Sequence, residues 1–157
     1  MPDPQRDFVR HALATIAYRG GKTIRDAPAE FARFSGAGKT PAQILAHLGD
    51  LFEWALRISQ GDQSWRDSKQ LDWEQEKERF FNSLSAFDAY VASGQPLQAP
   101  LEKLFQGPIA DALTHVGQLA MMRRLAGCPM RGENYYVASI EAGRVGPDQA
   151  RAAREFD

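Results

Sequence analysis

The sequence Asp111-Ala-Leu-Thr-His-Val-Gly-Gln-Leu-Ala-Met-Met-Arg-Arg-Leu-Ala-Gly127 decides the fold of this chain. When the stretch is wound as a helix, apolar side chains cover most of its circumference, and a helix of that kind is usually buried among other helices. Gly127 is expected to end the helix, and Pro129, two residues further on, cannot continue it. The stretch therefore predicts a central helix in an all-α protein.

One side of this helix carries polar groups. At about 100° per residue, Asp111, His115, Gln118 and Met122 recur on the same side. A carboxylate and an imidazole one turn apart thus point into or beside a helical core, which costs free energy unless they are hydrogen-bonded or bind a ligand. The central helix is therefore the first place to look for a functional site.

Three more long helices are predicted from apolar residues that recur every three or four positions, over residues 5–19, 41–60 and 72–92. Gly20-Gly21 is expected to end the first of them. Thr40-Pro41 begins the second, with an N-cap residue followed by proline at the first helical position.

Shorter elements complete the prediction. Residues 101–105 and 132–143 are expected to form short helices, the central helix to begin at Gly107-Pro108, and the charged tail after Gln149 to fray. No stretch shows the alternation of a β-strand. We therefore expect an all-α four-helix bundle with one long crossover and short extra helices, forming a single domain over residues 1–157.

Composition narrows the class of protein. The chain has 157 residues, of which 43% are hydrophobic and 25% charged, with a formal net charge of −1. Without a basic excess, neither nucleic acid nor an anionic membrane is expected as a partner. The sequence has no apolar run near 18 residues and no signal peptide at its start. A single cysteine, Cys128, excludes an intramolecular disulfide, so we expect a cytoplasmic protein.

Two histidines and an aspartate are candidate metal ligands. His47 lies on the second predicted helix, and Asp111 and His115 lie on the central one. Helical bundles commonly build sites from such inward-facing side chains, and this donor set suits Zn²⁺, Ni²⁺ or Fe²⁺. The spacing of four residues lets both side chains reach one ion from the same helix face. Spacing alone favours the alternative, in which a core histidine is hydrogen-bonded to an aspartate.

Three residues at the end of the central helix carry other chemistry. Cys128 follows the helix C-terminus, where nothing activates its thiol, so we do not expect it to be a nucleophile. Arg123 and Arg124 lie in the last turn, where they interact favourably with the helix dipole or the solvent. The less favoured alternative is that they bind the anionic group of a substrate.

Three motifs resemble the DinB-like superfamily, which includes YfiT-type thiol transferases and mycothiol-dependent maleylpyruvate isomerase. They are Ile-Leu-Ala-His47-Leu-Gly-Asp-Leu, His115-Val-Gly-Gln118-Leu, and the segment from Glu133 to Gly146. The resemblance spans roughly residues 5–146. It implies a four-helix bundle with three ligands for a divalent metal, in places that fall here on His47, Asp111 and His115. Many members have histidine where Asp111 stands, whereas the isomerase branch uses an acidic residue.

The resemblance implies a metal-dependent enzyme that uses zinc, nickel or iron. It would act on a small electrophile by thiol transfer, thiol-dependent isomerisation or hydrolysis, with a low-molecular-weight thiol as a candidate partner. Gln118 is expected to orient a ligand, and Trp54 and Met122 to wall the pocket. The alternative is a non-catalytic bundle that binds a small molecule, or a stress-related dimer with a vestigial metal site. Tyr135 and Tyr136, if exposed, favour a homodimer.

Overall fold

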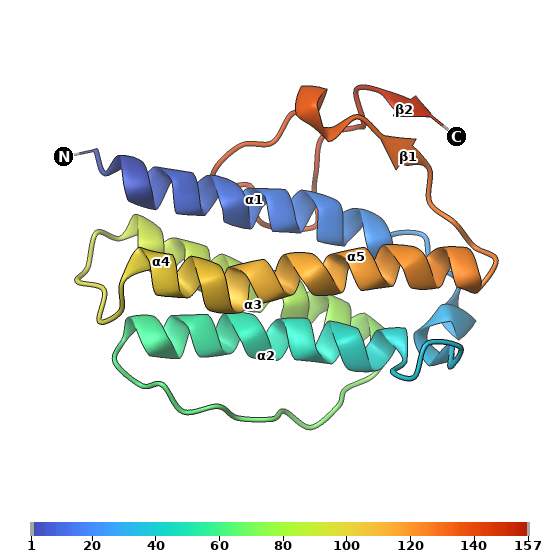
Figure 1. Ribbon diagram of the computed structural model, residues 1–157, viewed down its shortest axis with the longest axis horizontal. Helices are drawn as coiled ribbons and strands as arrows, with labels where there is room; N and C mark the ends of the chain where they lie inside the picture. Colours follow the sequence, from blue (N-terminus) through green and yellow to red (C-terminus); the bar gives the residue numbers. More distant parts are fainter. Residues whose placement is uncertain (1, 157) are drawn as a thin grey trace.

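Four long helices pack together in the computed structural model, which describes residues 2–156 (Figure 1). The helices are α1 (Pro4–Ile24), α2 (Pro41–Ser59), α3 (Trp73–Ala92) and α5 (Ala110–Leu125). The predicted all-α bundle is therefore confirmed. No helix within the described residues combines the length and the apolar character needed to cross a lipid bilayer.

The order of the helices explains the long crossover. Helices α1 and α5 run in one direction, and α2 and α3 run in the other (Figure 1). Because α2 and α3 are parallel, residues 60–72 must travel back along the length of α2 before α3 begins. The connection between α1 and α2 contains η1 (Ala29–Arg33), a 3₁₀ turn. The crossover between α2 and α3 also forms one wall of the candidate site.

The first helix does not end at Gly20-Gly21, as the sequence predicted, but continues to Ile24. Its glycines serve packing. A Cβ atom on Gly20 would lie 2.9 Å from Cζ of Phe80 on α3 and 3.3 Å from Cγ2 of Val116 on α5. Glycine at this position therefore lets α1 approach both neighbouring helices, and the prediction that it breaks the helix was wrong.

The central helix does not begin at Gly107-Pro108 either. Helix α4 (Leu101–Leu104), the π-helical turn η2 (Phe105–Ile109) and α5 follow one another without a break. Pro108 has no N–H, and its ring would clash with the carbonyl four residues earlier in a regular helix. The wider π turn accommodates it instead. Asp111 consequently lies inside a continuous run of helix, two residues after the π turn.

The C-terminal part of the chain differs most from the prediction. Residues 132–143 are not helical: β1 (Gly132–Glu133) pairs antiparallel with β2 (Glu155–Phe156), and η3 (Tyr135–Val137) is a single 3₁₀ turn. The tail was predicted to fray, but the pairing with β1 holds it through Phe156. Two-residue strands are too short to show the alternation by which a strand is recognised in a sequence.

A buried carboxylate explains why residues near 133 leave the helical pattern. Glu133 is 6% exposed and accepts hydrogen bonds from Lys22 and Tyr18, both on α1. This contact joins residues more than a hundred positions apart, so local periodicity cannot reveal it. Tyr135 also packs against Tyr18, whereas Tyr136 is 96% exposed. The homodimer stays a prediction.

The core lies where the four helices meet. Its largest fully buried side chains come from α1, α2 and α3 and from the short segments η1, α4 and η2: Leu13, Ile16, Ile24, Phe31, Leu45, Leu48, Phe52, Phe80, Leu84, Phe87, Leu104 and Ile109. Helix α5 adds Ala112 and Leu119, which are also fully buried. Such a core fixes the relative positions of α2 and α5, the two helices that carry the candidate ligands.

Candidate metal centre

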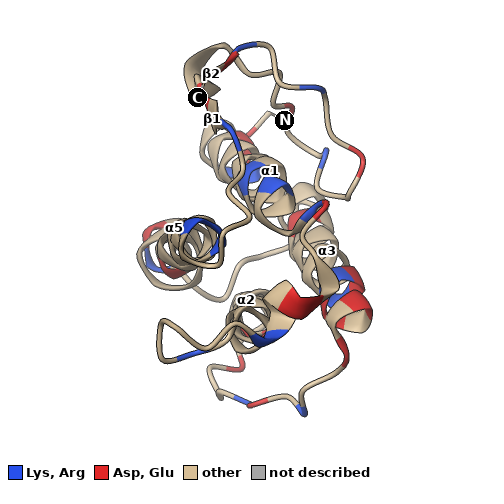
Figure 2. Ribbon diagram, turned by 90° about the vertical axis from the view of Figure 1, so that its right-hand side faces the viewer, with Lys and Arg blue, Asp and Glu red and all other residues tan. Residues whose placement is uncertain are grey.

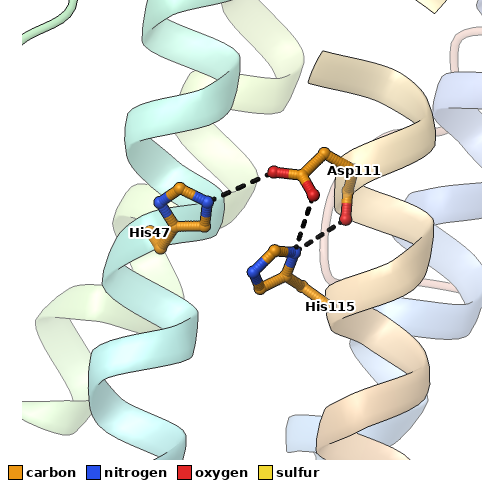
Figure 3. A group of neighbouring side chains, drawn as sticks. All are labelled: His47, Asp111 and His115. Carbon is orange, nitrogen blue, oxygen red and sulfur yellow. Dashed lines mark hydrogen bonds and ion pairs between the residues drawn. The ribbon is translucent and has the colours of Figure 1, made fainter. Parts of the chain in front are cut away.

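Two helices bring the three candidate ligands together. His47 projects from α2, and Asp111 and His115 project toward it from successive turns of α5 (Figure 3). One ligating atom from each side chain lies within 4.8 Å of the others, and among residues 2–156 this is the only such group of three or more. The structure thus places next to one another the three residues selected from the sequence. The third histidine, His11, is exposed on α1.

The carboxylate of Asp111 lies between the two imidazole rings (Figure 3). Its Oδ2 is 3.3 Å from Nε2 of His47, and its Oδ1 is 3.4 Å from Nδ1 of His115. The centroids of the two rings are 4.6 Å apart. The carboxylate and the two rings therefore face the same small volume.

Helix geometry sets the tautomer of His115. Its Nδ1 donates a hydrogen bond to the main-chain carbonyl of Asp111 at 2.8 Å. In a neutral imidazole one nitrogen carries the proton, so this bond leaves the lone pair on Nε2. Figure 3 shows Nε2 on the side of the ring that faces α2. A carbonyl partner on the other ring nitrogen is the usual arrangement of histidines that bind metals.

The triad lies at the edge of the bundle. Its side chains are 31% (His47), 44% (Asp111) and 18% (His115) exposed. The alternative interpretation was a core histidine hydrogen-bonded to an aspartate. The hydrogen bonds are present, but the residues that make them are not buried. The site is open enough for a small molecule to approach it from solvent.

A guanidinium from α3 holds the turn of α2 that carries His47. Arg79 donates to the carbonyl of Ala46 at 3.0 Å, to Glu53 at 3.0 Å and also to Asp50. Burial opposes the charge of Arg79, but the hydrogen bonds to Glu53 and Asp50 outweigh it and raise the pKa of the guanidinium. The carbonyl next to His47 is thus tied to a neighbouring helix, which restricts movement of that ligand.

The crossover covers His47 from the other side. The ring of Trp65 lies 5.5 Å from the ring of His47 and 5.4 Å from that of Trp54, centroid to centroid. The indole N–H of Trp54 donates to the carbonyl of Gln63 at 3.0 Å, which anchors the crossover. Trp54, predicted to wall the pocket, supports this wall, while Trp65 is in direct contact with the histidine.

A polar hollow of about 240 Å³ opens beside His47. It lies between the start of α2 and the crossover, and its lining is Lys39, Gln43, Ala46, His47, Asp50, Asp67, Ser68 and Gln70. This volume suits a small molecule, below the range of drug-sized ligand pockets. Of the triad, His47 alone lines it.

Gln118 and Met122, which were expected beside the metal site, have other surroundings. Gln118 is exposed and lines a different hollow, together with Ile44 and Met121, and no hydrogen bond among residues 2–156 joins it to the triad. Met122 is 2% exposed and belongs to the core. The role of Gln118 in orienting a ligand stays a prediction.

Trp65 and Arg79 were missed by sequence reasoning. Trp65 lies in a polar crossover without periodicity, where no local pattern marks a site residue. Arg79 lies on α3, three residues after Glu76, in a helix that carries many charges. Nothing in its spacing distinguishes it from an exposed surface charge.

Compared with known proteins, the chain matches no protein-family model, no curated protein and no solved structure at a significant level.

Proposed function

We propose that His47, Asp111 and His115 hold one divalent transition-metal ion, and that the protein is a metal-dependent enzyme acting on a small electrophile. The observation that carries the proposal is the convergence of two imidazoles and a carboxylate from two helices. A mixed nitrogen and oxygen donor set suits zinc, nickel or iron. Three protein ligands leave coordination positions open for water or substrate.

The distances fit an ion after a small adjustment. Three atoms bonded to one ion at about 2.0–2.2 Å lie within about 4 Å of each other. The candidate ligand atoms lie within 4.8 Å, so side-chain movements of about 1 Å are enough to complete the site. Because the three side chains are partly exposed, such movements do not disturb the core.

A bound ion would lower the pKa of a coordinated thiol or water and so supply a nucleophile at neutral pH. The chain's own residues would position the ion's ligands and the substrate. The hydrogen bond from His115 to the carbonyl of Asp111 keeps the imidazole oriented, and the bond from Arg79 to Ala46 holds the α2 turn. The hollow beside His47 gives a small electrophile a position next to the ligands.

The resemblance to the DinB-like superfamily supports a low-molecular-weight thiol as the co-substrate. Thiol transfer, thiol-dependent isomerisation and hydrolysis all fit a site with open positions. Trp65 adds an apolar wall against His47, which shields one side of the site from water. A thiol would be held between this wall and the ligands.

Metal content and thiol consumption test the proposal together. Protein purified without a histidine tag is expected to carry one transition-metal ion per chain and to consume a thiol with a panel of electrophiles. His115→Ala should lose both properties, and His11→Ala, which changes the exposed histidine, should keep both. Absence of any metal in the wild-type protein, even after incubation with zinc, nickel or iron, would refute the proposal. Metal without turnover would favour the non-catalytic alternative.

A further inference from the structure

A second hollow, of about 530 Å³, lies between the C-terminal ends of α1 and α5 and the segment that leads into β2. Figure 2 looks onto this end of the molecule, with blue basic segments on the near ends of α1 and α5. Arg123, which lines it, follows His115 by eight residues, or about 12 Å along a helix. The hollow is therefore separate from the triad.

Basic side chains predominate in its lining. The cations are Lys22, Arg25, Arg123, Arg131 and Arg151, and the acids are Asp26, Glu133 and Glu155. Five formal positive charges against three negative ones leave an excess of two, although the whole chain has a net charge of −1. Such a concentration of charge in a concave site attracts anions.

Most of the acidic charge is already engaged. Lys22 donates to Glu133 at 2.6 Å and to Glu155 at 3.2 Å. Tyr18 donates its hydroxyl to the second oxygen of Glu133. Burial and this hydrogen bond raise the pKa of Tyr18, so the hydroxyl stays a donor. The hydrogen bonds of these two carboxylates are thus made to α1 and not to the arginines of the hollow.

Arg123 carries a buried charge without a carboxylate. It is 7% exposed, and its guanidinium donates to the main-chain carbonyls of Cys128 at 2.8 Å, Arg25 at 3.0 Å and Thr23 at 3.4 Å. Within residues 2–156 no ion pair joins it to an acid. Carbonyls at helix ends offset part of its charge. The remainder favours an anion in the hollow, because a buried charge without a counter-charge is unfavourable.

Two more arginines flank this buried guanidinium from different segments. Arg25 follows the last residue of α1, and Arg151 lies in the stretch before β2. Both are exposed, and in the described part of the chain neither side chain makes a hydrogen bond or ion pair. Guanidinium groups bind carboxylates and phosphates through two parallel hydrogen bonds. Arg25, Arg123 and Arg151 all line this one hollow.

We propose that this hollow binds a small dianionic molecule, a phosphate ester or a dicarboxylate, whose oxyanion is held by Arg25, Arg123 and Arg151. The three guanidinium groups together offer several N–H donors to the oxygens of such a group. The volume exceeds that of the hollow beside His47 and admits an organic group as well as the anion. The anion would add a contact between α1, α5 and the C-terminal segment to those that Arg123 and Glu133 already make.

Isothermal titration of the full-length protein, freed of metal beforehand, tests this proposal. The probes are phenyl phosphate and succinate at constant ionic strength. We expect saturable binding of at least one of them with one site per chain. Arg25→Ala and Arg151→Ala should each weaken binding about tenfold, the loss of one charged hydrogen-bonding group. The tighter of the two probes identifies the class of ligand.

Arg154→Ala is the matched control. It removes the same charge from the same segment, but Arg154 does not line the hollow, so its affinity should equal that of the wild type. Failure of both probes to bind would overturn the proposal. Equal weakening by Arg154→Ala would also overturn it, because the binding would then follow general charge and not the hollow. Neither result bears on the triad, since the titration is made without metal and the variants leave its residues unchanged.

Discussion

Replacing Asp111 separates a metal site from a group that is merely hydrogen-bonded. The Asp111 side chain is 44% exposed, and its contact with His47 spans 3.3 Å. A partly exposed pair of this kind contributes about 0–1 kcal/mol. Without metal, Asp111→Ala should therefore cost at most about 1 kcal/mol, which lowers the melting temperature by no more than about 4 °C in a protein of this length.

Metal changes the expected magnitude, because an ion that binds the folded chain stabilises it. At a free ion concentration 100 times Kd, the gain is about 2.7 kcal/mol, or about 5–11 °C in melting temperature. If loss of one ligand weakens binding about a hundredfold, Asp111→Ala is half occupied at that concentration and gains about 0.4 kcal/mol. Its shift then falls to about 1–2 °C.

Asp111→His completes the comparison. It supplies a third imidazole at a position exposed enough to admit the larger side chain, and three histidines are a known set of zinc ligands. The zinc-dependent shift should therefore persist in Asp111→His. If the residues were only a hydrogen-bonded group, this substitution would lower stability and show no metal effect.

Thermal melts with and without Zn²⁺, Ni²⁺ and Fe²⁺ measure these differences in the wild type, Asp111→Ala and Asp111→His. His11→Ala serves as the control, because it removes an imidazole outside the site and should shift as the wild type does. Equal metal-dependent shifts in the wild type and Asp111→Ala would refute the assignment of Asp111 as a ligand. No shift in any of the proteins would refute the metal site.

Other substitutions test the parts of the chain that hold the site. Arg79→Met leaves Asp50, whose side chain is 8% exposed, without its cation, so urea unfolding should show a loss of about 3–5 kcal/mol; a loss below about 1 kcal/mol would mean that the pair is effectively solvated. Tyr18→Phe removes a donor from the buried carboxylate of Glu133 and should cost about 1–3 kcal/mol. Burial and that hydrogen bond raise the pKa of Tyr18, so its contribution is full below the unfolded pKa of about 10 and is lost as the pH rises further. Unfolding measured from pH 8 to 11 should show this decline in the wild type and a smaller one in Tyr18→Phe; identical profiles would contradict it. Cys128→Ser should leave the melting temperature and any turnover unchanged, because a position beyond a helix C-terminus disfavours the thiolate; loss of turnover in a folded Cys128→Ser protein would contradict this.

Helical periodicity was enough to predict the bundle and to place Asp111 and His115 on one face of a helix. Apolar residues at helical spacing define each long helix, and the packing of such helices follows from the need to bury one face. Asp111 and His115 share a face because they are four residues apart, which is a local property. His47 lies on another helix, and its selection relied on the resemblance as well as on the bundle.

Long-range packing accounts for most of the predictions that were wrong. Gly20 was expected to break a helix, but the approach of Phe80 requires a glycine there. Pro108 was expected to begin a helix, but a π turn passes through it. Residues 132–143 were expected to be helical, but Glu133 is bound by Lys22 on α1. The first and the third of these outcomes depend on a partner distant in the sequence, as does the contact between Trp65 and the candidate site, whereas the π turn is a local response to Pro108.

Anomalous X-ray scattering from crystals grown with Zn²⁺ tests the central claim most directly. Data collected on the two sides of the zinc absorption edge should show one strong peak between His47, Asp111 and His115, bonded to each at about 2.0–2.2 Å. Crystals of His115→Ala should lack that peak. Absence of a peak at the triad in the wild-type crystals, or a zinc ion bound only elsewhere on the protein, would contradict the metal site on which the proposed function rests.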